Sequence, residues 1–180
     1  MRRHASQGGL RCDTVAMAAI DDHLARLSSA HASFVALRPG IEAREPWPLA
    51  DAFGVEPEAS WGPPEVLAHV SEMLRFWLGE IERVLAGSPE PVPFGRIATD
   101  DMRIGIIGRD RSLPVGELYS RISSDVRRYQ ERLPTLTPDE LEKRGAHPTA
   151  GELTVTEMVE RFAVRHFDEH VGQLETILGG

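Results

Sequence analysis

Several residue types and patterns are scarce in this sequence, and each scarcity excludes a class of protein. A single cysteine, Cys12, is present in 180 residues, so the chain has neither an intramolecular disulfide nor a cysteine metal cluster. The apolar runs span only a few residues, far below the roughly 20 that cross a bilayer, and no apolar signal core follows Met1. We therefore expect a cytoplasmic protein that does not bind membranes, in which His, Asp or Glu must hold any metal.

Positive charge is also scarce. The chain carries 20 Lys and Arg against 28 Asp and Glu, which gives a net charge of -8 at pH 7. Proteins that bind a phosphate backbone generally present a basic patch. The basic cluster of Arg121, Arg127 and Arg128 is interleaved with Glu117 and Asp125, which is typical of a solvated helix face. We therefore expect no nucleic-acid partner.

Length and composition predict a single globular domain. A chain of 180 residues that is 41% hydrophobic and 27% charged falls within the ordinary range for one domain. Residues 1–13 lack periodicity, and we expect them to be a disordered leader, with Met17 as an alternative start. The domain itself is expected to span residues 14–180.

Four stretches have apolar residues spaced three and four apart, the pattern of amphipathic helices. They span residues 14–37, 63–85, 112–133 and 154–178. No convincing strand pattern lies between them. Long amphipathic helices with no sheet bury their apolar faces against one another, so the sequence predicts an all-α four-helix bundle.

Proline and one capping motif mark the expected helix boundaries. Pro39 is expected to end the first helix, and the proline-rich residues 38–64 are expected to form a crossover without regular secondary structure. Residues 88–111 form a second connection, long enough to be a functional cover. Thr154 and Glu157 have the spacing of a capping box, in which each side chain bonds the backbone N–H of the other residue.

Two histidines of the fourth predicted helix face the bundle interior. At about 100° per residue, His166 and His170 lie on the apolar face and one turn apart, so both rings can reach one ion. A buried imidazole without a partner costs about 1–3 kcal/mol. On the second predicted helix, His69 also faces inward. The predicted inner face of the fourth helix consists of Val155, Met158, Val159, Phe162, His166, Glu169, His170, Gln173 and Ile177.

Together these histidines predict an open metal site. His69, His166 and His170 leave at least one coordination position for water, as in catalytic rather than structural sites. Zn²⁺ and Ni²⁺ are the expected ions, and Fe²⁺ and Mn²⁺ are compatible, since imidazole ligands do not choose among them. His31 also lies on an apolar stripe, but a lone inward histidine is more often a hydrogen-bonded core residue than a ligand.

Glu169 is the candidate general base beside this site, and its alternative is a solvated or capping role. Residues 166–170 also match the H-x-x-E-H pattern of inverted zinc metalloproteases. Those enzymes take their third ligand from well downstream, whereas only ten residues follow His170. The pattern therefore does not indicate a protease.

Three segments resemble the DinB/YfiT-like superfamily: residues 66–70 around His69, the turn at residues 147–154, and residues 166–173. The resemblance spans about residues 14 to 178. It implies a bundle of up-down-down-up type with long crossover loops. It also implies a divalent metal held by one histidine from the second helix and two, spaced H-x-x-x-H, from the fourth, which fall on His69, His166 and His170.

The resemblance implies several activities. Characterised relatives include thiol S-transferases and isomerases that use mycothiol, bacillithiol or glutathione, in which the metal lowers the pKa of the thiol. Our leading hypothesis is thus a metal-dependent transferase or isomerase that uses a low-molecular-weight thiol and acts on a small-molecule substrate. The alternatives are a metal-dependent hydrolase with Glu169 as base, and a non-catalytic metal-binding stress-response protein. Fold alone does not choose among them.

Two further features bear on partners. Trp47, Phe53 and Trp61 in the first crossover either form the patch of an expected homodimer or cover the end of the bundle. The second connection carries four arginines, which either meet a substrate carboxylate or are solvated loop charges. They are Arg96, Arg103, Arg109 and Arg111.

Overall fold

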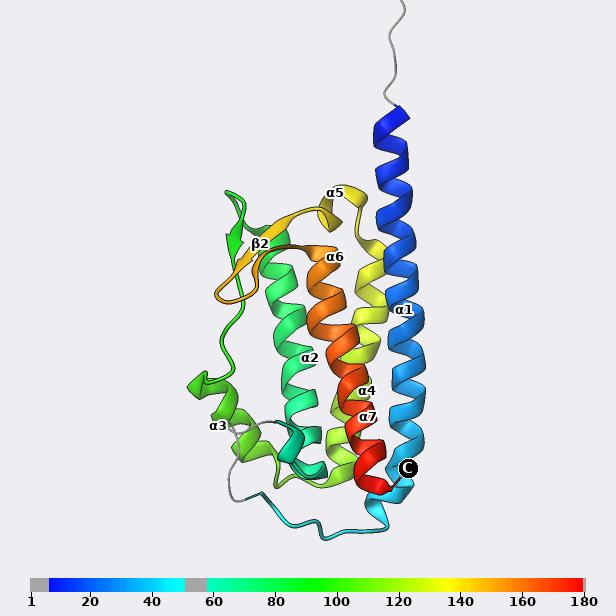
Figure 1. The fold of residues 1–180 in the computed structure, drawn as a ribbon, viewed down its shortest axis with the longest axis vertical. Coiled ribbons are helices and arrows are strands. Elements are labelled where there is room, and N and C mark those ends of the chain that lie inside the picture. Colours follow the sequence, from blue (N-terminus) through cyan, green and yellow to red (C-terminus); the bar gives the residue numbers. More distant parts are fainter. Residues whose placement is uncertain (1–6, 51–57, 180) are drawn as a thin grey trace, which may run out of the picture.

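Four long helices form the body of the protein in the computed structural model, which describes residues 7–50 and 58–179 (Figure 1). They are α1 (Gln7–Glu42), α2 (Pro63–Ala86), α4 (Val115–Arg132) and a composite fourth helix. The composite helix consists of α6 (Val155–Met158), a π-helical segment η3 (Val159–Val164) and α7 (Arg165–Leu178). The predicted all-α four-helix bundle is confirmed.

The four helices have the expected up-down-down-up arrangement. Figure 1 shows α2 and α4 running in the same direction, with α1 and the composite helix running opposite to them. Helix α4 packs against both α1 and α2, and α7 packs against α1. Because α2 and α4 are parallel, the chain between them must return along the length of the bundle, and this return segment passes beside α2.

The first helix is longer than predicted at both ends. It continues through Pro39 to Glu42, so the prediction that Pro39 ends the helix is wrong. Proline removes one backbone hydrogen bond, but Ile41 beyond it is fully buried and Arg38 donates to Glu42 across the same turn. At the other end, α1 begins at Gln7 and covers residues 7–13 of the expected leader, while residues 1–6 lie outside the described residues.

The two connections contain short elements that the sequence pattern did not reveal. A 3₁₀ turn, η1 (Glu58–Ser60), precedes α2, and α3 (Asp101–Asp110) lies within the second connection. The strands β1 (Val92–Pro93), β2 (Arg144–His147) and β3 (Gly151–Thr154) form a small sheet, with β1 parallel and β3 antiparallel to β2. The expectation of no strands was wrong because strands of two to four residues are too short to show an alternating pattern. The remaining short elements are the 3₁₀ turn η2 (Leu133–Thr135) and the four-residue helix α5 (Pro138–Leu141).

The composite helix begins as predicted but then changes phase. Thr154 and Glu157 form the expected capping box. In η3, however, the backbone N–H of Arg165 bonds the carbonyl of Glu160, five residues earlier. Such a π turn holds one more residue than an α turn, so every later side chain is rotated about the helix axis relative to a regular α-helix.

This rotation corrects the predicted inner face of the fourth helix. Phe162 and Gln173 are only partly buried, and Glu169 is exposed. The buried centre of the face instead follows Ala163, Phe167, His170, Val171 and Leu174. His166 lies at the edge of the buried face, where the fourth helix meets the pocket described below.

Two of the three aromatic residues in the first crossover cover the end of the bundle. Trp61 is almost fully buried, and Trp47 packs against the core while its indole N–H donates to the carbonyl of Ile41. Phe53 lies outside the described residues. The expected homodimer stays a prediction. Within residues 7–50 and 58–179, no helix has the length and apolar character needed to cross a membrane.

Candidate metal centre

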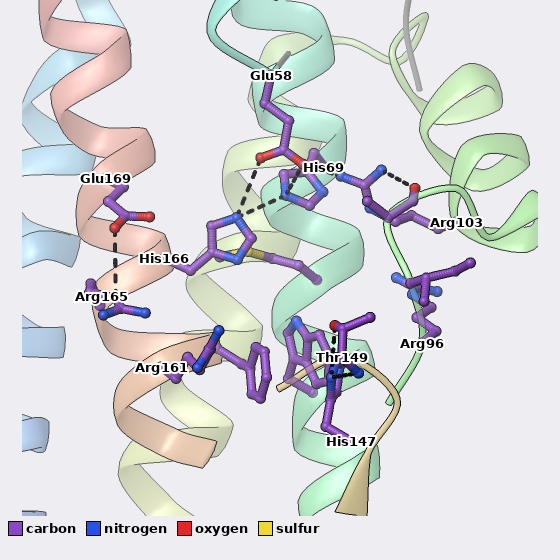
Figure 2. A pocket seen from close by; sticks show the side chains of 15 residues that line it. Glu58, His69, Arg96, Arg103, His147, Thr149, Arg161, Arg165, His166 and Glu169 are labelled. Carbon is purple, nitrogen blue, oxygen red and sulfur yellow. Dashed lines mark hydrogen bonds and ion pairs between the residues drawn. The ribbon is translucent and has the colours of Figure 1, made fainter. Parts of the chain in front are cut away.

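Three histidines and one glutamate converge between α2 and α7. His69 projects from the N-terminal third of α2, His166 and His170 from α7, and Glu58 from the turn η1 (Figure 2). One nitrogen or oxygen atom of each of the four side chains lies within 4.8 Å of the others. The structure thus brings together the three histidines that the sequence singled out and adds a carboxylate that it did not.

The distances show that the side chains point at a common centre. The Nε2 atoms of His69 and His166 are 3.4 Å apart. The Glu58 carboxylate lies 3.7 Å from His69 Nε2, 3.6 Å from His166 Nε2 and 3.7 Å from His170 Nε2. Three imidazole nitrogens form a donor set that suits Zn²⁺, Ni²⁺ or Fe²⁺, and the carboxylate lies beside them.

The hydrogen bonding of His170 tests whether a metal fits this set. His170 Nδ1 lies 2.9 Å from the Gln173 side-chain oxygen, which can only accept, so Nδ1 carries the proton and Nε2 carries a lone pair. That Nε2 atom is buried and has no hydrogen-bond partner among the described residues. A buried acceptor without a partner is costly, and a divalent ion at the centre would satisfy it. Gln173 is fixed in turn by donating to the Glu58 carbonyl, an outer-shell contact of the kind that orients metal ligands.

Burial keeps the two innermost imidazoles neutral. Burial, reinforced by the neighbouring histidines, lowers the pKa of His69 well below its ordinary value. Burial and the neighbouring His166 lower the pKa of His170 to about 4. For Glu58, burial raises the pKa, but His166, Arg103 and His170 outweigh it and leave the pKa below its ordinary value. At neutral pH His69 and His170 are therefore neutral and Glu58 is ionised, which are the protonation states that metal binding requires of these residues.

These pKa shifts predict that the metal-free protein loses stability in weak acid. Unfolded His170 binds a proton near pH 6.5, whereas the folded residue does so only near pH 4. Between these values the unfolded state holds more protons, so the free energy of unfolding falls as the pH falls, by up to about 1.4 kcal/mol per pH unit for this group. Urea denaturation at several pH values measures the slope. His170→Gln should flatten it, and an unchanged slope in that variant would contradict the assignment.

A pocket of about 440 Å³ opens from the metal centre toward the sheet. Its walls come from α2, the return segment, the hairpin of β2 and β3, and the composite helix (Figure 2). The ring of Phe162 stacks on Trp77 at 4.1 Å between centroids and on His147 at 5.1 Å. The volume is that of a typical small-molecule site, with the histidine cluster at one end and an aromatic wall leading away from it.

Glu169 lines this pocket but does not belong to the four-residue cluster. Its side chain is 64% exposed and lies 3.7 Å from the Arg165 guanidinium. Figure 2 shows it beside Arg165 and apart from the histidines, whereas Glu58 points into the cluster. Glu58 is therefore better placed than Glu169 to exchange a proton with a reacting group.

The sequence missed Glu58 because its position depends on the path of the first crossover. It lies in a proline-rich stretch with no helical period, so no face could be assigned to it. The only available signal was a carboxylate shortly before the Pro63-Pro64 helix start, which is too common to point to a site.

The four arginines of the return segment divide into two groups. Arg96 and Arg103 line the pocket. Arg109 instead pairs with Asp110, and Arg111 pairs with the buried Glu65. Of these four arginines, only Arg96 and Arg103 therefore line the pocket.

The fold and the cluster define a class: a four-helix bundle with a histidine-rich candidate metal centre between its second and fourth helices. The family model described as the DinB superfamily matches residues 18–174, and the chain belongs to this superfamily. A search among curated proteins gave no match.

The fold is also similar to a solved structure. YfiT from Bacillus subtilis, described as a probable metal-dependent hydrolase with an unusual four-helix bundle topology, aligns with a TM-score of 0.65. The alignment covers 98% of this chain and 90% of YfiT at 15% sequence identity. At this identity the likeness shows a shared fold.

Proposed function

We propose that this protein is a divalent-metal-dependent enzyme whose metal is held by His69, His166 and His170, with Glu58 as the proton acceptor. The observation that carries the proposal is the convergence of three imidazole Nε2 atoms and one carboxylate at the end of an open pocket. Bound there, a divalent ion would act as a Lewis acid and lower the pKa of a thiol or water beside it.

The chain's own residues have separate tasks in this proposal. His170, oriented by Gln173, and the buried His69 fix the ion. Glu58 is ionised at neutral pH because its neighbours lower its pKa against the effect of burial, and it is held at the cluster by an ion pair with Arg103. In this proposal the carboxylate accepts the proton of the nucleophile, and the aromatic wall of the pocket packs against the rest of the substrate.

We infer that the nucleophile is a low-molecular-weight thiol and that the reaction is an S-transfer or isomerisation. The family resemblance supports a thiol, and the pocket has room for one beside an electrophile. In the transfer, the thiol proton passes to Glu58, sulfur forms a bond to an electrophilic carbon, and the leaving group departs with its electron pair. The second candidate is hydrolysis, which is favoured by the description of the structurally similar YfiT as a probable metal-dependent hydrolase.

A substrate panel separates the two candidates. Tag-free protein loaded with Zn²⁺ or Ni²⁺ is assayed with small thiols and an aryl halide, and in parallel with aryl esters without thiol. We expect turnover that requires both the thiol and the metal and that disappears after chelation. Ester cleavage without any thiol would instead support the hydrolase, and inactivity across both panels would contradict both candidates.

A further inference from the structure

The pocket carries more positive charge than the proposed function uses. Four arginines line it: Arg96 and Arg103 from the return segment, and Arg161 and Arg165 from the composite helix. Figure 2 shows the two pairs on opposite sides of the pocket. Four guanidinium groups around one small cavity repel one another unless anionic groups neutralise them, although the chain as a whole has a net charge of -8.

The pair on the return segment already has anionic partners. Arg103 donates to Glu58 and to the Ala98 carbonyl. Arg96 donates to the buried Glu72 and lies 3.7 Å above the centroid of the Phe76 ring. Both guanidiniums are largely buried and neutralised by these contacts. They hold the wall of the pocket in place and have little charge left for a ligand.

The pair on the composite helix differs. Arg165 lies 3.7 Å from Glu169, but both side chains are more than half exposed, so solvent weakens their attraction. Arg161 has no carboxylate within 4 Å among the described residues. Its guanidinium lies 5.6 Å from the ring centroid of Phe162. Arg161 is thus the pocket arginine whose charge is not already matched within the described part of the chain.

Arg161 lies at the aromatic end of the pocket, away from the metal cluster. Its neighbour Phe162 stacks on Trp77 and on His147. Burial lowers the pKa of His147, and the Arg161 cation adds to this effect against a hydrogen bond with the Arg96 backbone that raises the pKa. A ligand whose reacting atom lies at the histidines would reach Arg161 with its far end, because His166 and Arg161 both line this pocket (Figure 2).

We propose that Arg161 is the anion-binding residue of this pocket and that the substrate is a small molecule bearing a carboxylate, separated from its reacting atom by an apolar segment. Arginine suits this role because its planar fork can donate two parallel hydrogen bonds to a carboxylate. The inference rests on the proposed function for the reacting end of the ligand. Binding of the carboxylate itself does not require the metal.

The test compares a carboxylate with its uncharged analogue. The dissociation constants of 3-phenylpropanoate and 3-phenylpropanamide are measured by NMR titration, with metal-free and with Zn²⁺-loaded protein. We expect the carboxylate to bind about tenfold more tightly than the amide, the scale of one charge-assisted hydrogen bond. Arg161→Ala should abolish this preference, while Arg127→Ala, which removes an exposed arginine from α4 outside the pocket, should retain it.

Two results would overturn the inference. One is a wild-type protein that fails to prefer the carboxylate, whether both probes bind equally or neither binds at millimolar concentration. The other is an Arg161→Ala variant that is folded by its amide spectrum and retains the full preference. Because the metal-free titration needs neither metal nor turnover, an intact preference there in an enzymatically inactive protein would refute the proposed function alone.

Discussion

Replacing His69, His166 or His170 singly with alanine is expected to lower the affinity for Zn²⁺ by more than about 100-fold. Loss of an outer-shell partner alone commonly costs 10- to 100-fold, and each of these substitutions removes a nitrogen donor from the cluster itself. Elemental analysis of the purified proteins, followed by competition titration with a chromophoric chelator, measures the loss.

The matched control for these variants is His31→Ala. His31 lies on α1, and its ring bonds the Ser123 hydroxyl at 3.0 Å, away from the cluster. This variant should retain metal at the wild-type stoichiometry. Full metal content in the His69 or His166 variant would instead break the assignment of the metal centre.

Glu58→Gln is expected to reduce turnover by about 10²- to 10⁴-fold, the usual contribution of a positioned general base. Glutamine has nearly the same shape as glutamate but cannot accept a proton at neutral pH. The three histidine donors are unchanged, so we expect the variant to retain its metal. Steady-state rates of the metal-loaded variant, with metal content measured on the same sample, test this expectation.

Glu169→Gln separates the two candidate bases. Glu169 is exposed and lies beside Arg165 outside the cluster, so its substitution should leave the rate within about threefold of wild type, on the scale of a modest surface change. If Glu169→Gln abolished turnover while Glu58→Gln did not, the assignment of the base would have to be reversed.

The sequence predicted the fold well because helical periodicity is a local property. Each amphipathic stretch reveals a helix through the spacing of its own residues, and the Thr154 and Glu157 pair marks a helix start by spacing alone. Pro39 was misjudged because the burial of Ile41, which offsets the lost hydrogen bond, depends on the neighbouring helices. Tertiary packing routinely overrides such local signals.

The candidate site was only partly predictable, for a different reason. The four-residue spacing of His166 and His170 survives because both lie in α7, after the π turn. The π turn has no recognisable sequence signal. The predicted inner face of the fourth helix was therefore rotated from the real one, and Glu169 was wrongly predicted to face inward. The position of Glu58 depends on the path of the first crossover, and that of Arg161 depends on the phase of the π-helical segment. Residue spacing predicts neither position.

The parallel arrangement of α2 and α4 has a consequence for how the site is assembled. Glu58 precedes α2, Arg103 lies in the segment that returns along it, and His166 comes from the far end of the chain. These contacts join residues separated by 45 to more than 100 positions in sequence, the long-range kind that forms late in folding. A chain with all its helices formed but its crossovers undocked would have an incomplete centre. Tight metal binding would therefore show that the crossovers have docked onto the bundle, and not merely that the helices have formed.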